Sequence, residues 1–206
     1  MSVTIVVQRR MRPGQDTARV AAALRRVEEP GRPRPGRRPG RVFRWRDDAQ
    51  VLWYVGEWDS CEAYEARPLA ESASALDALC VGEAVRYYFA EIWLSWNMSL
   101  RTILWDGTLV QAPPGADLTV RPFLQHKAGE QRGMGSGLVE CRLYQDLHTA
   151  EQFLSLRGWA SPAAWQRFER ERGTALAASL RRVGAIATPV VELTLLEYDR
   201  LVLAGP

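Results

Sequence analysis

The feature of this sequence that most constrains its fold is an internal repeat. The run Pro13-Gly14-Gln15-Asp16 is matched by Pro114-Gly115-Ala116-Asp117, a displacement of 114 − 13 = 101 residues. Farther along, Trp58-Asp59-Ser60 is matched by Trp159-Ala160-Ser161, and the displacement is again 159 − 58 = 101 residues. Two matches that keep one register favour a duplication over chance pairing. We therefore predict two units, residues 1–100 and 101–206.

The first unit has the pattern of a ferredoxin-like fold. Asp16 is a suitable N-cap for a helix that Pro30-Gly31 would end, and Asp59-Ser60 would cap a second helical segment. Short runs rich in β-branched and aromatic residues predict strands at Ser2–Gln8, Arg41–Arg46, Val51–Trp58 and Val85–Trp96. The resulting order is βαββαβ, the ferredoxin-like unit.

The second unit is predicted to repeat this order. Pro122 is expected to disturb the helix that follows Asp117. Ser161-Pro162 provides an N-cap and a first-turn proline for a helix that ends near Gly184. Strands are predicted in Thr102–Gln111, in a hairpin spanning Val139–Trp159, and in Pro189–Tyr198.

One ferredoxin-like unit covers only one face of its antiparallel sheet with helices. A second copy on the same chain has a high effective concentration and can cover the other face. The fold class that we predict is therefore α+β, with two tandem ferredoxin-like units packed sheet to sheet as an intramolecular dimeric α/β barrel.

The charge of the chain comes from one segment. The formal net charge is +3, but Pro30–Gly40 contains Arg32, Arg34, Arg37 and Arg38, and without them the charge would be 3 − 4 = −1. These arginines are not interleaved with aromatic residues, so we predict no binding to nucleic acid. This segment has two interpretations. It is a solvated loop, or it is an anchor for an acidic substrate or partner.

Cysteine usage and hydropathy indicate where the protein works. The three cysteines, Cys61, Cys80 and Cys141, are widely spaced and odd in number, which does not suit a disulfide framework. No apolar run approaches the length of a membrane span or of a signal-peptide core. We expect a cytoplasmic protein with no membrane association.

The usual catalytic motifs are missing from the sequence. The two histidines, His126 and His148, are not at metal-ligand spacing from Cys, Asp or Glu, so we predict no metal site. The glycine-rich run Gly133–Gly137 leads into a predicted strand, and a phosphate-binding turn would need a helix there. Hydrolase and nucleotide-binding chemistry are therefore not favoured.

Two segments carry a resemblance to a known family. A strand ending in Gly56-Glu57-Trp58 is followed by Asp59–Tyr64, and the second unit has the matching segment Gly158–Trp165. On these residues the chain resembles the antibiotic biosynthesis monooxygenase superfamily of dimeric α+β barrels. The resemblance implies an oxygenase of aromatic polyketide tailoring that uses dioxygen without a metal or a tightly bound cofactor. Related two-copy members imply an alternative, oxidative ring opening with reduced flavin supplied by a partner reductase.

The resemblance also implies site residues. Trp58 and Tyr64 occupy the positions at which the single-copy anthrone oxygenases are thought to contact or transform substrate. An asparagine implicated in several relatives is replaced by Tyr54 in the first unit and by Ser155 in the second. This replacement motivates two other hypotheses on the same scaffold, a non-redox polyketide cyclase or isomerase and a binding protein for an aromatic metabolite.

Aromatic residues on the predicted strands and helices are candidates for holding a planar substrate. Large flat rings bind one another through offset or edge-to-face contacts, although core packing is the alternative role for each of them. The predicted substrate-binding residues are Tyr54, Trp53, Tyr87, Trp159 and Trp165.

An oxygenase without its own redox centre needs a proton acceptor, because the substrate phenol must become an electron-rich anion. His148, in a predicted turn, is the candidate base, and Trp58 and Tyr64 are the candidate donors to the oxyanion. The expected partners are the polyketide, dioxygen, a flavin reductase in the ring-opening alternative, and a second copy of the chain.

Overall fold

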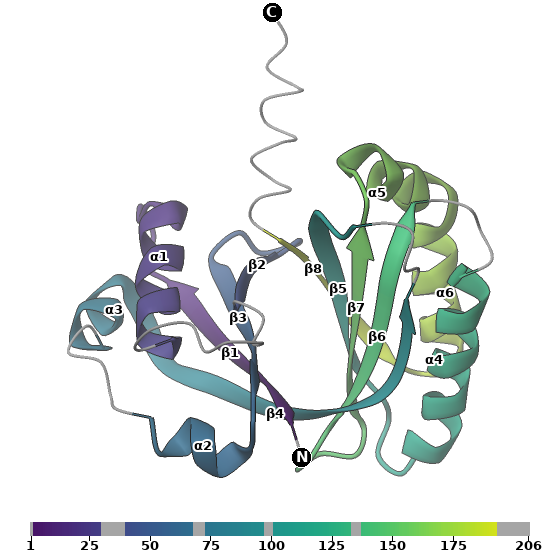
Figure 1. Cartoon of the computed structure of the whole chain (residues 1–206), viewed down its shortest axis with the longest axis horizontal. Helices are drawn as coiled ribbons and strands as arrows, with labels where there is room; N and C mark the ends of the chain where they lie inside the picture. Colours follow the sequence, from purple (N-terminus) through teal and green to yellow (C-terminus); the bar gives the residue numbers. More distant parts are fainter. Residues whose placement is uncertain (1, 30–39, 68–72, 97–100, 133–136, 193–206) are drawn as a thin grey trace, which may run out of the picture. The chain divides into compact units, whose positions relative to one another are not determined.

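The computed structural model describes residues 2–29, 40–67, 73–96, 101–132 and 137–192 (Figure 1). The chain divides into two compact units, Met1–Ala90 and Glu91–Pro206. The strand β4, Cys80–Trp96, begins in unit 1 and ends in unit 2. The boundary predicted after residue 100 follows the end of this strand.

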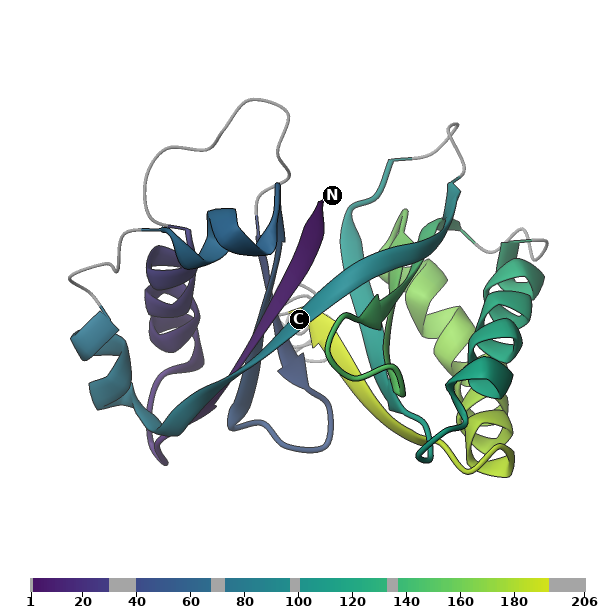
Figure 2. The ribbon, with the colours of Figure 1, turned by 90° about the horizontal axis from the view of Figure 1, so that it is seen from below.

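Unit 1 contains a four-stranded antiparallel sheet with the order β4-β1-β3-β2. The helices α1, α2 and α3 lie on one side of this sheet (Figures 1 and 2). The elements that precede β4 are β1 (Val3–Met11), α1 (Thr17–Glu28), β2 (Arg41–Trp45), β3 (Val51–Trp58), α2 (Cys61–Glu65) and α3 (Ala73–Leu79).

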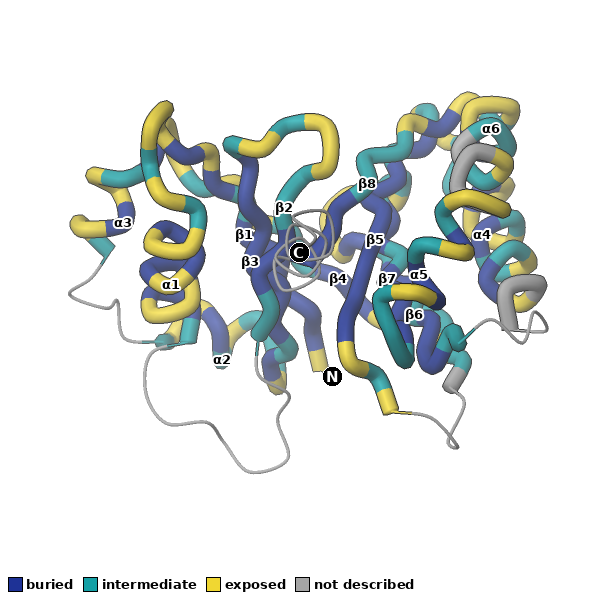
Figure 3. Tube along the Cα trace, turned by 90° about the horizontal axis from the view of Figure 1, so that it is seen from above, coloured by how far each residue is buried: buried dark blue, intermediate teal, exposed yellow. Residues whose placement is uncertain are grey.

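The helix starts of unit 1 follow from side-chain caps. Asp16 accepts a hydrogen bond from the Ala18 N–H at 3.0 Å and begins α1, as predicted. Ser60 accepts one from the Ala63 N–H at 3.1 Å and begins α2, also as predicted. The buried side of α1 faces the sheet and its exposed side faces solvent (Figure 3).

Unit 2 contains a second antiparallel sheet with the order β8-β5-β7-β6. Its helices also lie on one side of the sheet (Figure 1). Its elements are β5 (Leu104–Gln111), α4 (Asp117–Arg132), β6 (Leu138–Asp146), β7 (Gln152–Trp159), α5 (Pro162–Phe168), a π-helical segment η1 (Glu169–Gly173), α6 (Thr174–Arg182) and β8 (Ile186–Glu192).

The central strands of the two units pair in the same register. Val3 of β1 lies opposite Trp58 of β3, and Leu104 of β5 lies opposite Trp159 of β7. Each residue of the unit 2 pair follows its counterpart in unit 1 by the same number of residues, since 104 − 3 = 101 and 159 − 58 = 101. The predicted α+β class is confirmed, and the packing of one sheet against the other stays a prediction.

Three elements differ from the expectations. Pro122 does not interrupt α4, because it is exposed while Val120 and Leu124 bury the apolar side of the helix in the unit 2 core. The strand β4 begins at Cys80, earlier than predicted. The last strand, β8, covers Ile186–Glu192, and the remainder of its predicted range lies outside the described residues.

In the described parts of the chain, no helix combines the length and the apolar character needed to span a membrane.

Candidate functional site

Tyr64 and Trp58, the two residues singled out by the resemblance, lie together in unit 1. Trp58 is the last residue of β3, and Tyr64 lies one turn into α2, whose start is set by the Ser60 cap. Their rings are 5.2 Å apart between centroids and nearly perpendicular, at 76°. Both residues are buried: Trp58 is 6% exposed and Tyr64 is 1% exposed. The short connection between β3 and α2 therefore brings the predicted pair into an edge-to-face contact.

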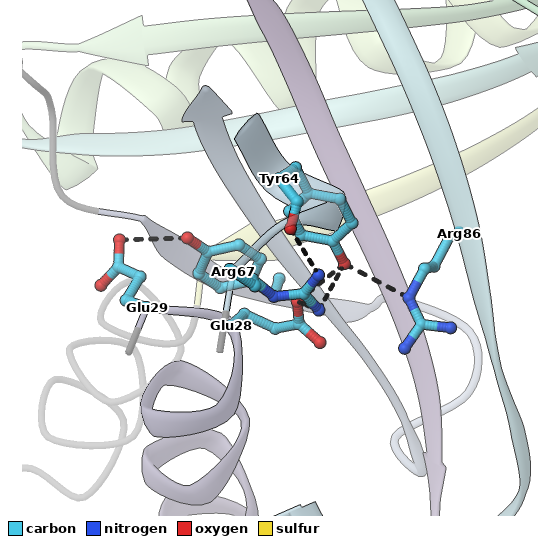
Figure 4. Close-up of polar contacts among 6 residues, drawn as sticks. Glu28, Glu29, Tyr64, Arg67 and Arg86 are labelled. Carbon is cyan, nitrogen blue, oxygen red and sulfur yellow. Dashed lines mark hydrogen bonds and ion pairs between the residues drawn. The ribbon is translucent and has the colours of Figure 1, made fainter. Parts of the chain in front are cut away.

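The Tyr64 hydroxyl is the centre of a polar cluster (Figure 4). It donates a hydrogen bond to Glu28 Oε2 at 2.8 Å. It accepts one from Arg67 Nη2 at 2.9 Å and one from Arg86 Nε at 3.2 Å. A phenol hydroxyl has one donor and two acceptor positions, so all of them are in use here.

Glu28 and Arg67 form the buried half of this cluster. Glu28 is the last residue of α1 and is 1% exposed. Its Oε2 also accepts from Arg67 Nη2 at 2.8 Å, and the Arg67 guanidinium carbon lies 3.6 Å from the centroid of the Tyr64 ring. A buried carboxylate is costly unless it is paired and hydrogen-bonded, and here it is both. The ion pair therefore locks the position of the phenol.

Burial and neighbouring charges shift the pKa values of Tyr64 and Arg86. Burial, and next the charge of Glu28, raise the pKa of the Tyr64 phenol above its ordinary value, so it stays protonated at neutral pH. Burial alone would lower the pKa of Arg86, but its hydrogen bond to Tyr64 and the charge of Glu28 outweigh this and raise the pKa. The cluster thus holds two guanidinium cations and one carboxylate.

Arg86 is the point at which the cluster reaches the surface. It lies on β4 and its side chain is exposed, whereas Glu28, Tyr64 and Arg67 are not. Among the described residues, Nε is the only Arg86 nitrogen in a hydrogen bond. Tyr88, two residues along the same strand, places its ring 6.0 Å from that of Tyr64. A group that approaches from solvent would therefore meet a guanidinium beside aromatic rings.

Tyr54 lies close to the cluster, but its hydroxyl is hydrogen-bonded to a different carboxylate. Its hydroxyl donates to Glu29 Oε1 at 3.0 Å, and this oxygen also accepts from the backbone N–H of Gly40. The ring is fully buried against Gly40 and Gly56, where any Cβ would collide with it. The substrate-binding role of Tyr54 stays a prediction. The one hydroxyl proton of Tyr54 is already donated to Glu29.

Trp53 and Tyr87 belong to the other face of the unit 1 sheet. Successive residues of a strand point to opposite faces, which separates Trp53 from Tyr54. The rings of Trp53 and Tyr87 are 6.4 Å apart, and the Tyr87 hydroxyl donates to Gln8 Oε1 at 3.4 Å. These two predicted substrate residues therefore form a group separate from Tyr64.

Trp159 and Trp165 pack in the core of unit 2. Trp159 is fully buried, its indole N–H donates to Asp106 Oδ1 at 2.8 Å, and its ring lies 5.0 Å from that of Phe168. Trp165 is 7% exposed and packs in the same apolar cluster, which includes Leu104. The structure thus surrounds both rings with core residues.

His148 lies in an exposed turn of unit 2, where its backbone N–H donates to Asp146 Oδ1 at 2.9 Å. The described contacts of the Tyr64 cluster all come from unit 1 residues. The catalytic role of His148 stays a prediction. Within the described ranges, no three His, Cys, Asp or Glu side chains are grouped in a way that could hold a metal ion.

Sequence reasoning missed Glu28, Arg67 and Arg86. A signal existed for Glu28, because it follows Leu24 by four residues and so falls on the apolar face of α1. A carboxylate on such a face needs a buried partner. Arg67 and Arg86 have no comparable signal, since an arginine near a helix end or on an edge strand is usually solvated.

Comparisons with known proteins give the fold but no close relative. No protein-family model matches this sequence, and neither does any curated protein. Among solved structures, an anthrone oxidase-like protein superposes with a TM-score of 0.64 at 12% identity, covering 93% of this chain and 91% of that one.

Two further structures are similar in the same way. A protein from Fusobacterium nucleatum subsp. nucleatum ATCC 25586, named as a proposed monooxygenase, superposes with a TM-score of 0.63 at 8% identity and covers 93% of this chain and 92% of its own. A ferredoxin-fold protein related to antibiotic biosynthesis monooxygenases, from Listeria monocytogenes 4b F2365, has a TM-score of 0.52 at 8% identity, with 93% and 95% covered. At such identities the likeness shows a shared α+β fold.

Proposed function

We propose that this chain is an oxygenase of the antibiotic biosynthesis monooxygenase type, which oxidises a polycyclic aromatic phenol at the Tyr64 cluster of unit 1. The observation that carries the proposal is the buried Tyr64 hydroxyl, held by Glu28, Arg67 and Arg86 beside the Trp58 ring. The fold shared with an anthrone oxidase-like protein and with proteins named as monooxygenases supports the reaction class.

The excess positive charge of the cluster supports an anionic substrate. Arg67 and Arg86 face a single carboxylate, Glu28, so one cation is not balanced within the cluster. An ionised phenol at Arg86 would supply the missing negative charge, and the pKa of the bound phenol would fall for this reason. Its proton can leave to water at the exposed Arg86 side, which removes the need for a buried base.

The reaction balances without an added reductant. A phenolate conjugated to a CH₂ group is electron-rich and reduces dioxygen, so that one oxygen atom becomes a ring ketone and the other leaves as water. The protein's part is to hold the oxyanion and to exclude water from the aromatic surface. Trp58 and Tyr88 supply the aromatic contacts in this proposal. Reduced flavin from a partner reductase is the proposed electron source in the ring-opening alternative.

We also propose that the chain arose by duplication of one ferredoxin-like unit and that the two sheets pack together as a barrel. The equal strand registers of the two units support the duplication. A polyketide pathway, a cytoplasmic location and a homodimer of the two-unit chain remain part of the same proposal.

The test is oxygen uptake with 1,8-dihydroxyanthrone, with and without reduced FMN. Uptake above the uncatalysed rate without flavin, and its loss in Arg86→Gln, is the expected result. Uptake that needs flavin would indicate ring-opening chemistry. Binding of the anthrone without any uptake would contradict the oxygenase and leave the cyclase, isomerase or binding-protein alternatives. Arg19→Gln, on the exposed side of α1, is the matched control.

A further inference from the structure

We infer that each chain has one aromatic-ligand site, in unit 1, and that a buried ion pair between Asp106 and Arg157 has turned the matching position of unit 2 into structural core. The ligand class rests on the proposed function. The assignment of the site to unit 1 rests on a comparison of the Tyr64 cluster with the matching residues of unit 2, which differ in type and in contacts.

The positions of unit 2 that match the Tyr64 cluster carry no hydroxyl, cation or carboxylate. The central strands and the helices that follow the Ser60 and Ser161 caps match at a displacement of 101 residues, and the other elements can be matched through their strand pairing and burial. Tyr64 corresponds to Trp165, since 165 − 64 = 101, and Arg67 corresponds to Phe168. The buried residues Val20 and Leu24 of α1 match the buried residues Val120 and Leu124 of α4, so Glu28 corresponds to Ala128. Arg86 corresponds to Pro189, because Val7 lies opposite Arg86 and Thr108 lies opposite Pro189. The hydroxyl, both cations and the carboxylate are therefore absent from these positions of unit 2.

A different polar pair takes their place beneath the helices of unit 2. Asp106 and Arg157 lie on neighbouring strands, at positions that are Ile5 and Gly56 in unit 1. Asp106 Oδ1 accepts from Arg157 Nε at 3.0 Å and from the Trp159 indole at 2.8 Å, and Asp106 Oδ2 accepts from Arg157 Nη2. The carboxylate thus holds a two-point contact with the guanidinium.

The pair is neutral and enclosed, unlike the cluster of unit 1. Both residues are 3% exposed, and the guanidinium carbon of Arg157 lies 4.8 Å from the centroid of the Phe168 ring. One carboxylate balances one guanidinium, so no charge remains for an anionic ligand. Pro189, the counterpart of Arg86, cannot provide a cation. A planar phenolate would therefore find no unbalanced cation beside this pair.

One group in unit 2 could still serve a ligand. The indole N–H of Trp165 is buried and has no hydrogen-bond partner within the described residues. Trp165 occupies the position that matches Tyr64 in the sequence. Tyr64→Phe removes the hydroxyl that contacts Glu28 and Arg86, and Trp165→Phe removes this indole N–H. Tyr64→Phe and Trp165→Phe are therefore a natural pair of variants for deciding which unit binds.

The binding experiment titrates the whole chain with 1,8-dihydroxyanthraquinone and measures affinity and stoichiometry by calorimetry. We expect one molecule per chain, a loss of affinity of about tenfold or more in Tyr64→Phe and in Arg86→Gln, and less than about twofold change in Trp165→Phe. Two molecules per chain, or a loss of affinity in Trp165→Phe alone, would overturn the inference.

The stability experiment tests, without any ligand, whether the ion pair between Asp106 and Arg157 stabilises the core of unit 2. Arg157→Met leaves Asp106 buried without its cation, so the melting temperature should fall by roughly 5 °C or more, with the remaining folded protein still binding one probe molecule. Arg157→Met combined with Asp106→Leu should recover most of that loss. An unchanged melting temperature in Arg157→Met would contradict the structural role.

The outcomes separate this inference from the proposed function. Binding at unit 1 with no oxygen uptake would contradict the proposed oxygenase activity and support the single binding site. Oxygen uptake with two probe molecules bound per chain would support the oxygenase activity and contradict the single binding site. No binding of the probe would contradict both the ligand class and the unit 1 site.

Discussion

At the scale of single residues, Glu28 shows how a polar side chain on an apolar helix face becomes the support of a site. It is held by Arg67 and Tyr64 at hydrogen-bond distance, and it is 1% exposed. Each partner in turn has its position set by the carboxylate. The consequence is a phenol that is oriented before any ligand arrives.

Replacing Glu28 should therefore cost stability as well as activity. Glu28→Ala leaves the Arg67 cation buried without its partner, and we expect the free energy of unfolding to fall by about 3 kcal/mol. Urea denaturation measures this change. Glu65→Ala, which removes an exposed carboxylate of α2, is the control and should change the value by less than about 0.5 kcal/mol. Equal effects of the two variants would disprove the role of the buried pair.

A second prediction at this scale concerns the pH dependence of stability. Burial raises the pKa of the Cys141 thiol from 9.0 to about 12. Between these values the unfolded chain loses the thiol proton and the native protein keeps it, so the free energy of unfolding falls as the pH rises. From pH 8 to pH 10 the wild type should lose about 1.4 kcal/mol more than Cys141→Ala does. Parallel pH profiles of the two proteins would refute the shift.

At the scale of elements, the strand β3 serves both faces of the unit 1 sheet. Its alternation sends Tyr54, Gly56 and Trp58 to the side of the helices and Trp53 to the other side. Gly56 is required because the Tyr54 ring crosses directly over it. An added Cβ would lie 2.2 Å from the Tyr54 hydroxyl oxygen and 2.6 Å from Cζ.

Gly56→Ala should accordingly destabilise the protein, by about 1–3 kcal/mol, because the ring must leave its contact with Glu29. Thermal unfolding of the variant provides the measurement. Gly129→Ala is the matched control: a Cβ there meets no atom within 4 Å in the helix α4, and the variant should gain about 0.5–1 kcal/mol. Combining Gly56→Ala with Tyr54→Ser should cost less than the sum of the single changes. An additive result would show that the two residues do not compete for space.

At the scale of the whole molecule, the net charge depends on one short segment. Replacing Arg32, Arg34, Arg37 and Arg38 by Gln changes the formal charge from +3 to 3 − 4 = −1. We expect retention on a cation-exchange column at pH 7 to be lost, since adsorption follows the net charge and its clustering. The same four positions changed to Lys should retain the protein. Unchanged retention of the Gln variant would mean that another basic surface controls adsorption.

Much of the secondary structure could be predicted from local sequence. The caps Asp16, Ser60 and Ser161 begin helices where their side chains accept backbone N–H groups, and such contacts involve only neighbouring residues. Gly184 has a positive φ of 72° just after α6, as its place after a helix suggested. The expectation that Pro122 disturbs α4 was wrong because packing of the opposite helix face, which is a tertiary effect, outweighed one lost hydrogen bond.

The sequence by itself determined the α+β class, which depends on periodicity. It also singled out Trp58 and Tyr64, and the connection of a few residues between β3 and α2 brings their rings together. Only the tertiary structure decided that Glu28 and Arg86 meet at the Tyr64 hydroxyl, and that Asp106 and Arg157 meet in unit 2. These residues come from separate elements, and their contacts form only once helices and strands are packed. A charged side chain becomes a buried partner or a solvated one according to what packing places beside it.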